Sequence, residues 1–350
     1  MKRRSFLKLS ASSSLAVALG TPAVLRAQTR RFEGITLNIN GYGGDYSRIL
    51  NDYVAKPLAE QTGLKVAYQD GTAASAIAKL IASRDRPPYD IIMADSPNIP
   101  ELIAADLIDP VTRDELPNGG KLLDSVREFG DHGTPFLTNS IVLTYNSDLI
   151  KQPIASYKDL ARSDLNDRVG LLSPENTGGV LGLIALAEAY GGSLDNMQPA
   201  FDALADMRDN ISTITPATVS LLQLFEQEEV WAGPFWDGRI YSMRAKKLPM
   251  KTVVPQEGIY ALYNYLAPVK GSQNRDAALA YINQALSDKA VGAMVEFFRY
   301  APCTDIHIDP AVAADVVGYG EGRKLVKPVD WVKVSKMRGA MLEQFNKSTR

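Results

Sequence analysis

An aromatic ring stands next to a carboxylate at Trp236 and Asp237, and Tyr263, Asn264 and Tyr265 follow some way along the chain. A ring with a nearby carboxylate suits an alkylammonium group, because the ring face attracts a cation and the carboxylate pairs with its charge. We therefore expect Trp236, Asp237, Tyr263 and Asn264 to contact a ligand.

Two glycine-containing segments, 41–46 and 173–179, offer a second kind of chemistry. Backbone N–H groups that are free at the start of a helix favour an anionic or polar group, whereas acidic side chains in the same segments would favour an ammonium. A plain glycine turn, or a charge that only completes a first helical turn, is the simpler explanation of each segment. The further candidate ligand contacts are Tyr42, Gly44, Asp45, Asp95, Glu175, Asn176 and Thr177.

Enzymatic and metal chemistry find little support. The chain has neither a G-x-S-x-G nor an H-E-x-x-H motif, and its one cysteine, Cys303, lies four residues before His307 without any further sign of a thiolate–imidazole pair. Two histidines and no clustered cysteines make a transition-metal site improbable, and we expect no cofactor. A pair of glycosidase carboxylates needs no sequence motif, so an exported hydrolase remains an alternative.

The elements that must position these residues alternate between strands and helices. Segments 35–40, 64–69 and 91–93 have the pattern of strands, and helical spacing of apolar residues separates them. Strands joined by helices predict a mostly parallel sheet with helices on both faces. In such a sheet, ligands bind beyond the carboxyl ends of the strands, where the candidate segments fall.

Two long extended stretches, 134–145 and 251–269, bracket a central α/β block. We interpret them as crossovers between two lobes, each a mostly parallel sheet flanked by helices. Lobe 1 is then discontinuous, with residues 28–137 plus 260–310, and lobe 2 comprises 138–259. Residues 311–350 form a C-terminal helical segment, in which Trp331, Met337 and Met341 have helical spacing.

The first residues have the order of an export signal. A basic stretch at 2–8 precedes the apolar run 9–19, and the segment ends in the small residue Ala27. The adjacent Arg3 and Arg4 are typical of a twin-arginine signal, although Lys2 stands where Ser or Thr is usual. The apolar run is too short to span a bilayer. We expect a signal peptide at 1–27.

The charge of the mature chain argues against nucleic acid as a partner. Removal of 1–27 takes away five basic residues and no acidic ones, so the formal net charge of −2 becomes −7. An acidic surface repels both nucleic acid and anionic membranes. Cys303 alone cannot form an internal disulfide, so stability depends on a large core.

Several short segments, in this order and spacing, resemble the periplasmic solute-binding proteins of ATP-binding-cassette importers. The branch concerned includes the spermidine/putrescine-, ferric-iron- and thiamine-binding proteins, and the resemblance covers roughly residues 35–305. It implies the two-lobed periplasmic-binding-protein fold, in which the lobes close on a ligand about a hinge. The segments are Asn40-Gly41-Tyr42-Gly43-Gly44, residues 57–66, Tyr89-Asp90-Ile91-Ile92, Tyr145-Asn146, Phe235-Trp236-Asp237-Gly238 and Pro255-Gln256-Glu257-Gly258.

The same resemblance bears on the ligand. In polyamine-binding relatives a Trp is expected where Trp236 stands, while a second Trp and an Asp are expected near Leu262 and Asn264. Ferric-binding relatives use two adjacent tyrosines, and this chain has no Tyr-Tyr pair. The amine-binding pattern is therefore matched in part and the ferric pattern is absent.

These observations predict the substrate-binding component of an importer in the periplasm, which captures a small, polar, amine-bearing solute in the interlobe cleft. The expected partners are that solute and the membrane subunits of the importer, with no nucleic acid, and the protein is expected to be a monomer without catalytic activity. The first alternative is a binder of an anionic or zwitterionic solute, such as an amino-phosphonate, an organic acid or a thiamine-like compound. The second is the exported hydrolase.

Overall fold

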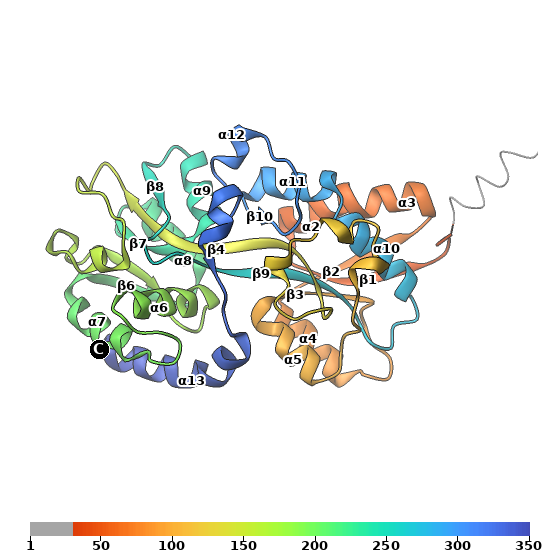
Figure 1. The fold of residues 1–350 in the computed structure, drawn as a ribbon, viewed down its shortest axis with the longest axis horizontal. Coiled ribbons are helices and arrows are strands. Elements are labelled where there is room, and N and C mark those ends of the chain that lie inside the picture. Colours follow the sequence, from red (N-terminus) through yellow and green to blue (C-terminus); the bar gives the residue numbers. More distant parts are fainter. Residues whose placement is uncertain (1–30) are drawn as a thin grey trace, which may run out of the picture.

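A computed structural model describes residues 31–350, and the predicted signal peptide lies outside this range. Two lobes stand at the two ends of a pair of long strands, and together they make an elongated molecule (Figure 1). This is the predicted two-lobed α/β architecture, with a mostly parallel sheet and flanking helices in each lobe.

Within residues 31–350, no helix combines the length and the apolar character that crossing a membrane requires.

Lobe 1 is built on parallel strands that pair in the order β2-β1-β3. Strand β3 is buried along nearly its whole length because helices cover both faces of the sheet. The strands of lobe 1 are β1 (Thr36–Gly41), β2 (Lys65–Asp70) and β3 (Ile91–Asp95). Its helices are α2 (Gly44–Leu50), the π-helical turn η1 (Asn51–Ala55), α3 (Lys56–Thr62), α4 (Ala73–Ala82), η2 (Ser96–Asn98), α5 (Ile99–Ala104), α10 (Arg275–Ala285) and α11 (Asp288–Phe298).

The crossovers are β4 (Thr134–Asn146) and β9 (Ile259–Pro268), which pair with each other antiparallel. In lobe 1, β9 pairs with β3, and in lobe 2, β4 pairs with β7, so one sheet runs through both lobes. The short strands β8 (Met250–Val253) and β10 (Ala301–Pro302) pair with β4, and β11 (Val326–Lys327) pairs with β9.

Lobe 2 continues the sheet with parallel strands in the order β7-β5-β6. Helix α6 is buried almost all round, as the uninterrupted apolar sequence of residues 180–187 requires. The strands of lobe 2 are β5 (Val169–Leu172), β6 (Ile211–Thr215) and β7 (Ala232–Trp236). Its helices are α6 (Thr177–Ala189), α7 (Gln198–Asp206), α8 (Thr218–Glu226) and α9 (Asp237–Ala245).

The buried apolar residues fall into separate cores for the two lobes. One core joins residues of 32–137 to residues of 263–316, and it fills lobe 1. Lobe 2 has two cores, one on each face of its sheet, and one of them also takes in apolar residues of the C-terminal helix α13 (Trp331–Ser348). Because β4 and β9 supply residues to the cores of both lobes, they are the structural connection between them.

The second extended stretch, at 251–269, differs from the expectation of one continuous segment. It is divided into β8 and β9 by a turn in which Gly258 has a φ of +99°, a conformation that glycine adopts most readily. Strand β6 was not foreseen, because every residue of this edge strand is only half-buried and its sequence carries little apolar signal.

Helix α13 is attached to both lobes. Val334, Met341 and Phe345 pack in the core of lobe 2, while the Trp331 indole N–H donates to Glu128 Oε1 of lobe 1 at 2.9 Å. The other carboxylate oxygen of Glu128 accepts hydrogen bonds from Ser96 Oγ at 2.6 Å and from the Tyr265 hydroxyl at 3.0 Å. Burial raises the pKa of Glu128, and these three donors offset part of that rise.

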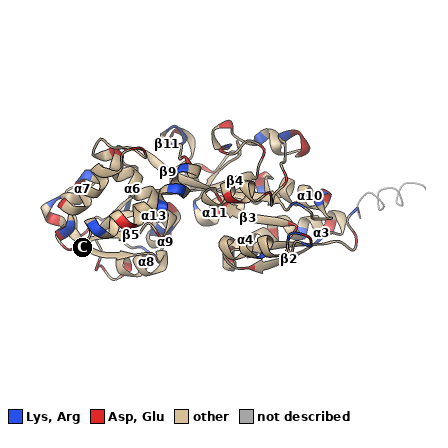
Figure 2. Ribbon diagram, turned by 90° about the horizontal axis from the view of Figure 1, so that it is seen from below, with Lys and Arg blue, Asp and Glu red and all other residues tan. Residues whose placement is uncertain are grey.

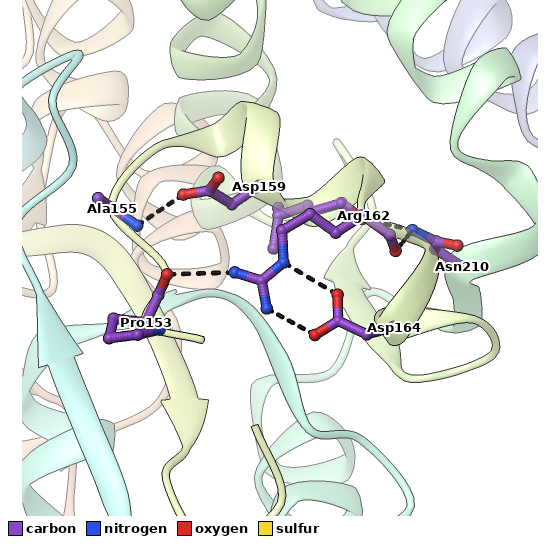
Figure 3. Close-up of polar contacts among 7 residues, drawn as sticks. Pro153, Ala155, Asp159, Arg162, Asp164 and Asn210 are labelled. Carbon is purple, nitrogen blue, oxygen red and sulfur yellow. Dashed lines mark hydrogen bonds and ion pairs between the residues drawn. The ribbon is translucent and has the colours of Figure 1, made fainter. Parts of the chain in front are cut away.

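Polar contacts hold the long connection between β4 and β5, which has little regular structure (Figure 3). The Arg162 guanidinium donates to both oxygens of Asp164, at 2.9 and 2.7 Å, and to the Pro153 carbonyl at 3.1 Å. Asn210 Nδ2 donates to the backbone carbonyls of Leu160 and Arg162, each at 2.8 Å. The connection is therefore fixed to lobe 2 away from the strand ends that face lobe 1.

Basic and acidic residues are interspersed along the helices of both lobes (Figure 2). Several form ion pairs between residues four positions apart, such as Lys56 with Asp52 and Lys347 with Glu343. Exposed pairs of this kind contribute little to stability, because water and salt screen the attraction between the charges. Surface ion pairs therefore contribute little to the stability of the fold, which comes mainly from the apolar cores of the two lobes.

Candidate functional site

A cavity of about 380 Å³ lies between the lobes at the carboxyl ends of β1 and β3. Lobe 1 and the crossovers form most of its wall, and α9 of lobe 2 contributes one side chain. This volume is near the lower end of the range of small-molecule sites, roughly 300–1,000 Å³. The lining residues are Tyr42, Gly43, Asp45, Tyr46, Asp95, Asn139, Arg239, Asn264, Phe298 and Tyr300.

Asp95 is the central polar group of the cavity. Its Oδ1 accepts a hydrogen bond from the Tyr42 hydroxyl at 3.0 Å and one from Asn264 Nδ2 at 2.7 Å. Burial raises the pKa of Asp95, and those two hydrogen bonds offset part of the rise. Among residues 31–350, no Lys or Arg forms an ion pair with this half-buried carboxylate. A carboxylate so placed is suited to a cation from outside the chain.

The register of the sheet explains the contact between Asp95 and Asn264. The two residues are direct partners in the antiparallel pair β3–β9, so their side chains lie on the same face. Tyr263, one residue earlier, therefore points to the opposite face, where it lines a smaller cavity with Thr138 and Arg323.

Aromatic rings form one wall of the cavity. The ring centroids of Tyr42 and Tyr46 are 5.1 Å apart in an edge-to-face arrangement, and Tyr46 and Phe298 are 5.7 Å apart. Phe298 and Tyr300 are stacked, with centroids 5.2 Å apart. Ring faces beside a carboxylate attract a desolvated alkylammonium group by cation–π interaction, worth about 2 kcal/mol or more.

Two side-chain amides in the cavity wall have oxygens that accept no hydrogen bond within residues 31–350. Oδ1 of Asn264 and Oδ1 of Asn139 are buried and have no hydrogen-bond partner among the described residues. The orientation of the Asn264 amide follows from chemistry, because only its NH₂ group can donate to the carboxylate of Asp95. Both oxygens are thus available to accept hydrogen bonds if the surrounding groups shift when a ligand enters.

The segment 41–46 approaches the cavity through its backbone. Gly43 and Gly44 have φ values of +77° and +54°, and a side chain at either position would be strained. Gly44 and Asp45 begin α2, and both are exposed. Asp45 lines the cavity but is paired with Arg48 at 2.9 Å, whereas Gly44 is not in the cavity wall.

Asn176, one of the predicted contacts in segment 173–179, has its side chain occupied by hydrogen bonds within the protein. Asn176 caps α6 by accepting from the Gly178 amide at 2.8 Å, and its Nδ2 donates to the Pro216 carbonyl at 2.9 Å. The Glu175 side chain is exposed, and its carbonyl accepts from Arg338 of α13 at 2.8 Å. Thr177 begins α6 and is half-buried. None of Glu175, Asn176 and Thr177 is in the cavity wall.

Trp236 and Asp237 end β7 and begin α9, next to the cavity but outside its lining. The half-buried Trp236 ring lies against Gly178 of α6, where an added Cβ would be only 3.0 Å from the indole. Asp237 is 3% exposed, and burial raises its pKa to about 7. Its Oδ1 accepts from the Gly238 amide at 2.8 Å, and its Oδ2 has no partner of ordinary geometry among residues 31–350.

The structure thus brings Tyr42, Asp45, Asp95 and Asn264 together, and it adds residues that the sequence reasoning missed. Arg239 follows the predicted Asp237 by two positions, so its proximity in sequence was a usable signal. Asn139 lies within a crossover, Phe298 ends α11 and Tyr300 follows it, and nothing in the sequence pattern marks these three residues. The added residues are Tyr46, Asn139, Arg239, Phe298 and Tyr300.

The residues considered for other chemistries lie elsewhere. Cys303 is buried, burial raises the pKa of its thiol to about 12, and His307 is exposed. A thiol with so high a pKa is a poor nucleophile at neutral pH. Within the described range, no group of three or more His, Cys, Asp or Glu side chains is placed to hold a metal ion.

Comparisons with known proteins agree with this architecture. The family model described as "Bacterial extracellular solute-binding protein" matches residues 53–316. The putrescine-binding periplasmic protein SpuD of Pseudomonas aeruginosa is 22% identical over 286 residues, which cover 71% of this chain and 75% of that protein.

Two solved structures share the fold. An ABC transporter protein from Clostridium perfringens has a TM-score of 0.79 at 20% identity and covers 90% of this chain and 100% of its own. The spermidine/putrescine ABC transporter substrate-binding protein PotD of Streptococcus pneumoniae has a TM-score of 0.76 at 18% identity, with 91% and 100% covered.

Proposed function

Because the chain belongs to the bacterial extracellular solute-binding protein family, we propose that it captures a small, polar, amine-bearing solute between its lobes. Delivery to the membrane subunits of an ATP-binding-cassette importer follows, without chemical change to the solute. The observation that carries the choice of an amine is Asp95, a half-buried carboxylate in the cavity that forms no ion pair with any Lys or Arg of residues 31–350. SpuD and PotD are named for binding putrescine and spermidine, which supports an amine but leaves its identity open.

The aromatic wall and the two amide oxygens support the same ligand class. Tyr42, Tyr46 and Tyr300 line the same cavity as Asp95, so an alkylammonium bound there would meet aromatic rings as well as a charge. Burial raises the pKa of Tyr42 well above its usual value, so its hydroxyl stays protonated and continues to donate to Asp95.

Binding is expected to raise the melting temperature of the mature protein and to bring the lobes together. A ligand that binds only the folded state stabilises it by mass action, so a thermal-shift screen of amines, organic acids and phosphonates identifies the class. Small-angle scattering should then show a smaller radius of gyration with the amine that is found, because closure buries it between the lobes. Mass spectrometry of the recovered amine checks that it is unchanged. Stabilisation by acids alone, or turnover of the bound compound, would contradict the proposal.

We also propose export to the periplasm through the twin-arginine signal at 1–27, consistent with the word periplasmic in the name of SpuD. Changing Arg3→Lys together with Arg4→Lys should leave unprocessed protein in the cytoplasm, because the export machinery reads the arginine pair. Immunoblots of cell fractions and N-terminal sequencing, with Gln28 as the expected first residue, check both points. The matched control is Arg26→Lys, which preserves the charge near the cleavage point. Normal processing of the double variant would refute this route.

A further inference from the structure

Among residues 31–350, Arg239 is the one basic side chain in the wall of the interlobe cavity. It belongs to the first turn of α9 in lobe 2, whereas Asp95 and Asp45 belong to lobe 1. Its exposed guanidinium takes part in no hydrogen bond or ion pair within residues 31–350. Arg244, on the same helix, differs in that it pairs with Asp315 at 2.6 Å.

The acidic and basic side chains of the cavity come from different lobes and are not paired with each other. No ion pair joins Arg239 to Asp95 or Asp45, although all three side chains line the same cavity. Both charges act on Tyr300. Burial first, and then the Asp237 charge, raise the pKa of Tyr300, while the Arg239 charge lowers this pKa and the Asp95 charge raises it. The cavity therefore has a negative end and a positive end, with a ring beside them.

A linear diamine fits such a cavity poorly. One ammonium group can pair with Asp95, but the other is brought toward Arg239, where like charges repel. A carboxylate at the second end instead meets a planar guanidinium, which binds carboxylates with two parallel hydrogen bonds. The two charges of the ligand would then match the two charges of the cavity.

We infer that the solute is a zwitterion with its amine and its acid at opposite ends, such as an ω-amino acid, whose ammonium faces Asp95 and whose carboxylate pairs with Arg239. This inference rests on the proposed function, because it assumes that the amine binds in the interlobe cavity. It assigns specificity to Arg239: this residue selects the acid end, while Asp95 and the aromatic wall select the amine end.

The test compares ligands that differ at one end only. Isothermal titration calorimetry is run on the mature protein with a series of linear diamines and with the ω-amino acids of the same chain lengths, for example putrescine and γ-aminobutyrate. The wild-type protein should bind the best ω-amino acid about tenfold or more tightly than its matched diamine. Arg239→Gln should remove this preference by weakening the ω-amino acid about tenfold or more, while diamine binding stays equal or improves. Arg244→Gln is the matched control and should change neither the affinity for ω-amino acids nor the affinity for diamines.

The remaining outcomes distinguish a failure of the inferred zwitterion from a failure of the proposed amine binding. If diamines bind as tightly as ω-amino acids and Arg239→Gln leaves both affinities unchanged, the ligand does not need a carboxylate. The inference is then wrong, while the proposed binding of an amine is still supported. If Arg239→Gln weakens both series equally, Arg239 holds the lobes together and does not select the ligand, which also overturns the inference. If neither series binds, or if simple monocarboxylates bind as tightly as the ω-amino acids, the amine of the proposed function fails and this inference fails with it.

Discussion

Asp95→Asn is expected to weaken binding of the amine found by the screen by roughly thirtyfold or more. The variant removes one partner of a desolvated charge pair and leaves the ligand cation without compensation, which costs about 2–5 kcal/mol. The Asn oxygen can still accept from Tyr42 and Asn264, so these two hydrogen bonds are preserved. Isothermal titration calorimetry gives the affinity directly.

The unliganded Asp95→Asn protein should be as stable as the wild type or more stable. Burial raises the pKa of Asp95, which means that the folded protein holds its charged form at a cost, and the neutral amide avoids that cost. A lost thermal shift together with an unchanged or higher melting temperature would separate a binding defect from misfolding. Asp276→Asn is the control, because Asp276 is an exposed carboxylate paired with Arg31 and lies outside the cavity wall. A change of less than about threefold for Asp95→Asn would remove Asp95 from the binding site.

Asp237 is expected to make the unliganded protein less stable as the pH rises. Burial raises the pKa of this side chain to about 7 in the folded protein, above its usual value of 3.8. Its contribution to stability is therefore fully present below about pH 3.8 and is lost as the pH rises through 7. A difference of roughly three pKa units corresponds to at most about 4 kcal/mol of unfolding free energy.

Asp237→Asn isolates this contribution. Near pH 4 the variant and the wild type should have similar unfolding free energies, and at pH 8 the variant should be more stable by up to about 4 kcal/mol. Urea unfolding at both pH values gives the difference, and Asp45→Asn reports the effect of losing an exposed carboxylate. If the unfolding free energies of Asp237→Asn and the wild type differ by the same amount at both pH values, Asp237 does not titrate in this range.

Much of the fold follows from local pattern. The alternation of strand-like and helix-like segments predicted a two-lobed α/β protein, and the apolar stretch at 134–145 predicted the crossover that is now β4. The end of α3 also follows from the local sequence, because Gly63 adopts a left-handed conformation with φ +77° that terminates the helix. Edge strand β6 escaped prediction because neither of its faces is fully buried.

The candidate site was only partly accessible from the sequence. The rule that ligands bind at the carboxyl ends of parallel strands selected Tyr42 and Asp95, and both lie in the cavity wall. The same rule selected Asn176, whose side chain is occupied as a helix cap. Whether a polar side chain at a strand end meets a ligand or caps a helix depends on neighbours that the local sequence does not specify.

The sequence by itself determined which segments form strands and helices and where the loops near the lobe interface fall, because hydrophobic periodicity and glycine positions are local properties. Only the tertiary structure decided that Asn264 and not Tyr263 faces Asp95, since one residue of register reverses the face of a strand. It also brought Arg239 of lobe 2 into the same cavity wall as Asp95 of lobe 1, and it buried Asp237. Contacts between residues far apart in the chain depend on how lobes, strands and helices pack, and no local pattern carries that information.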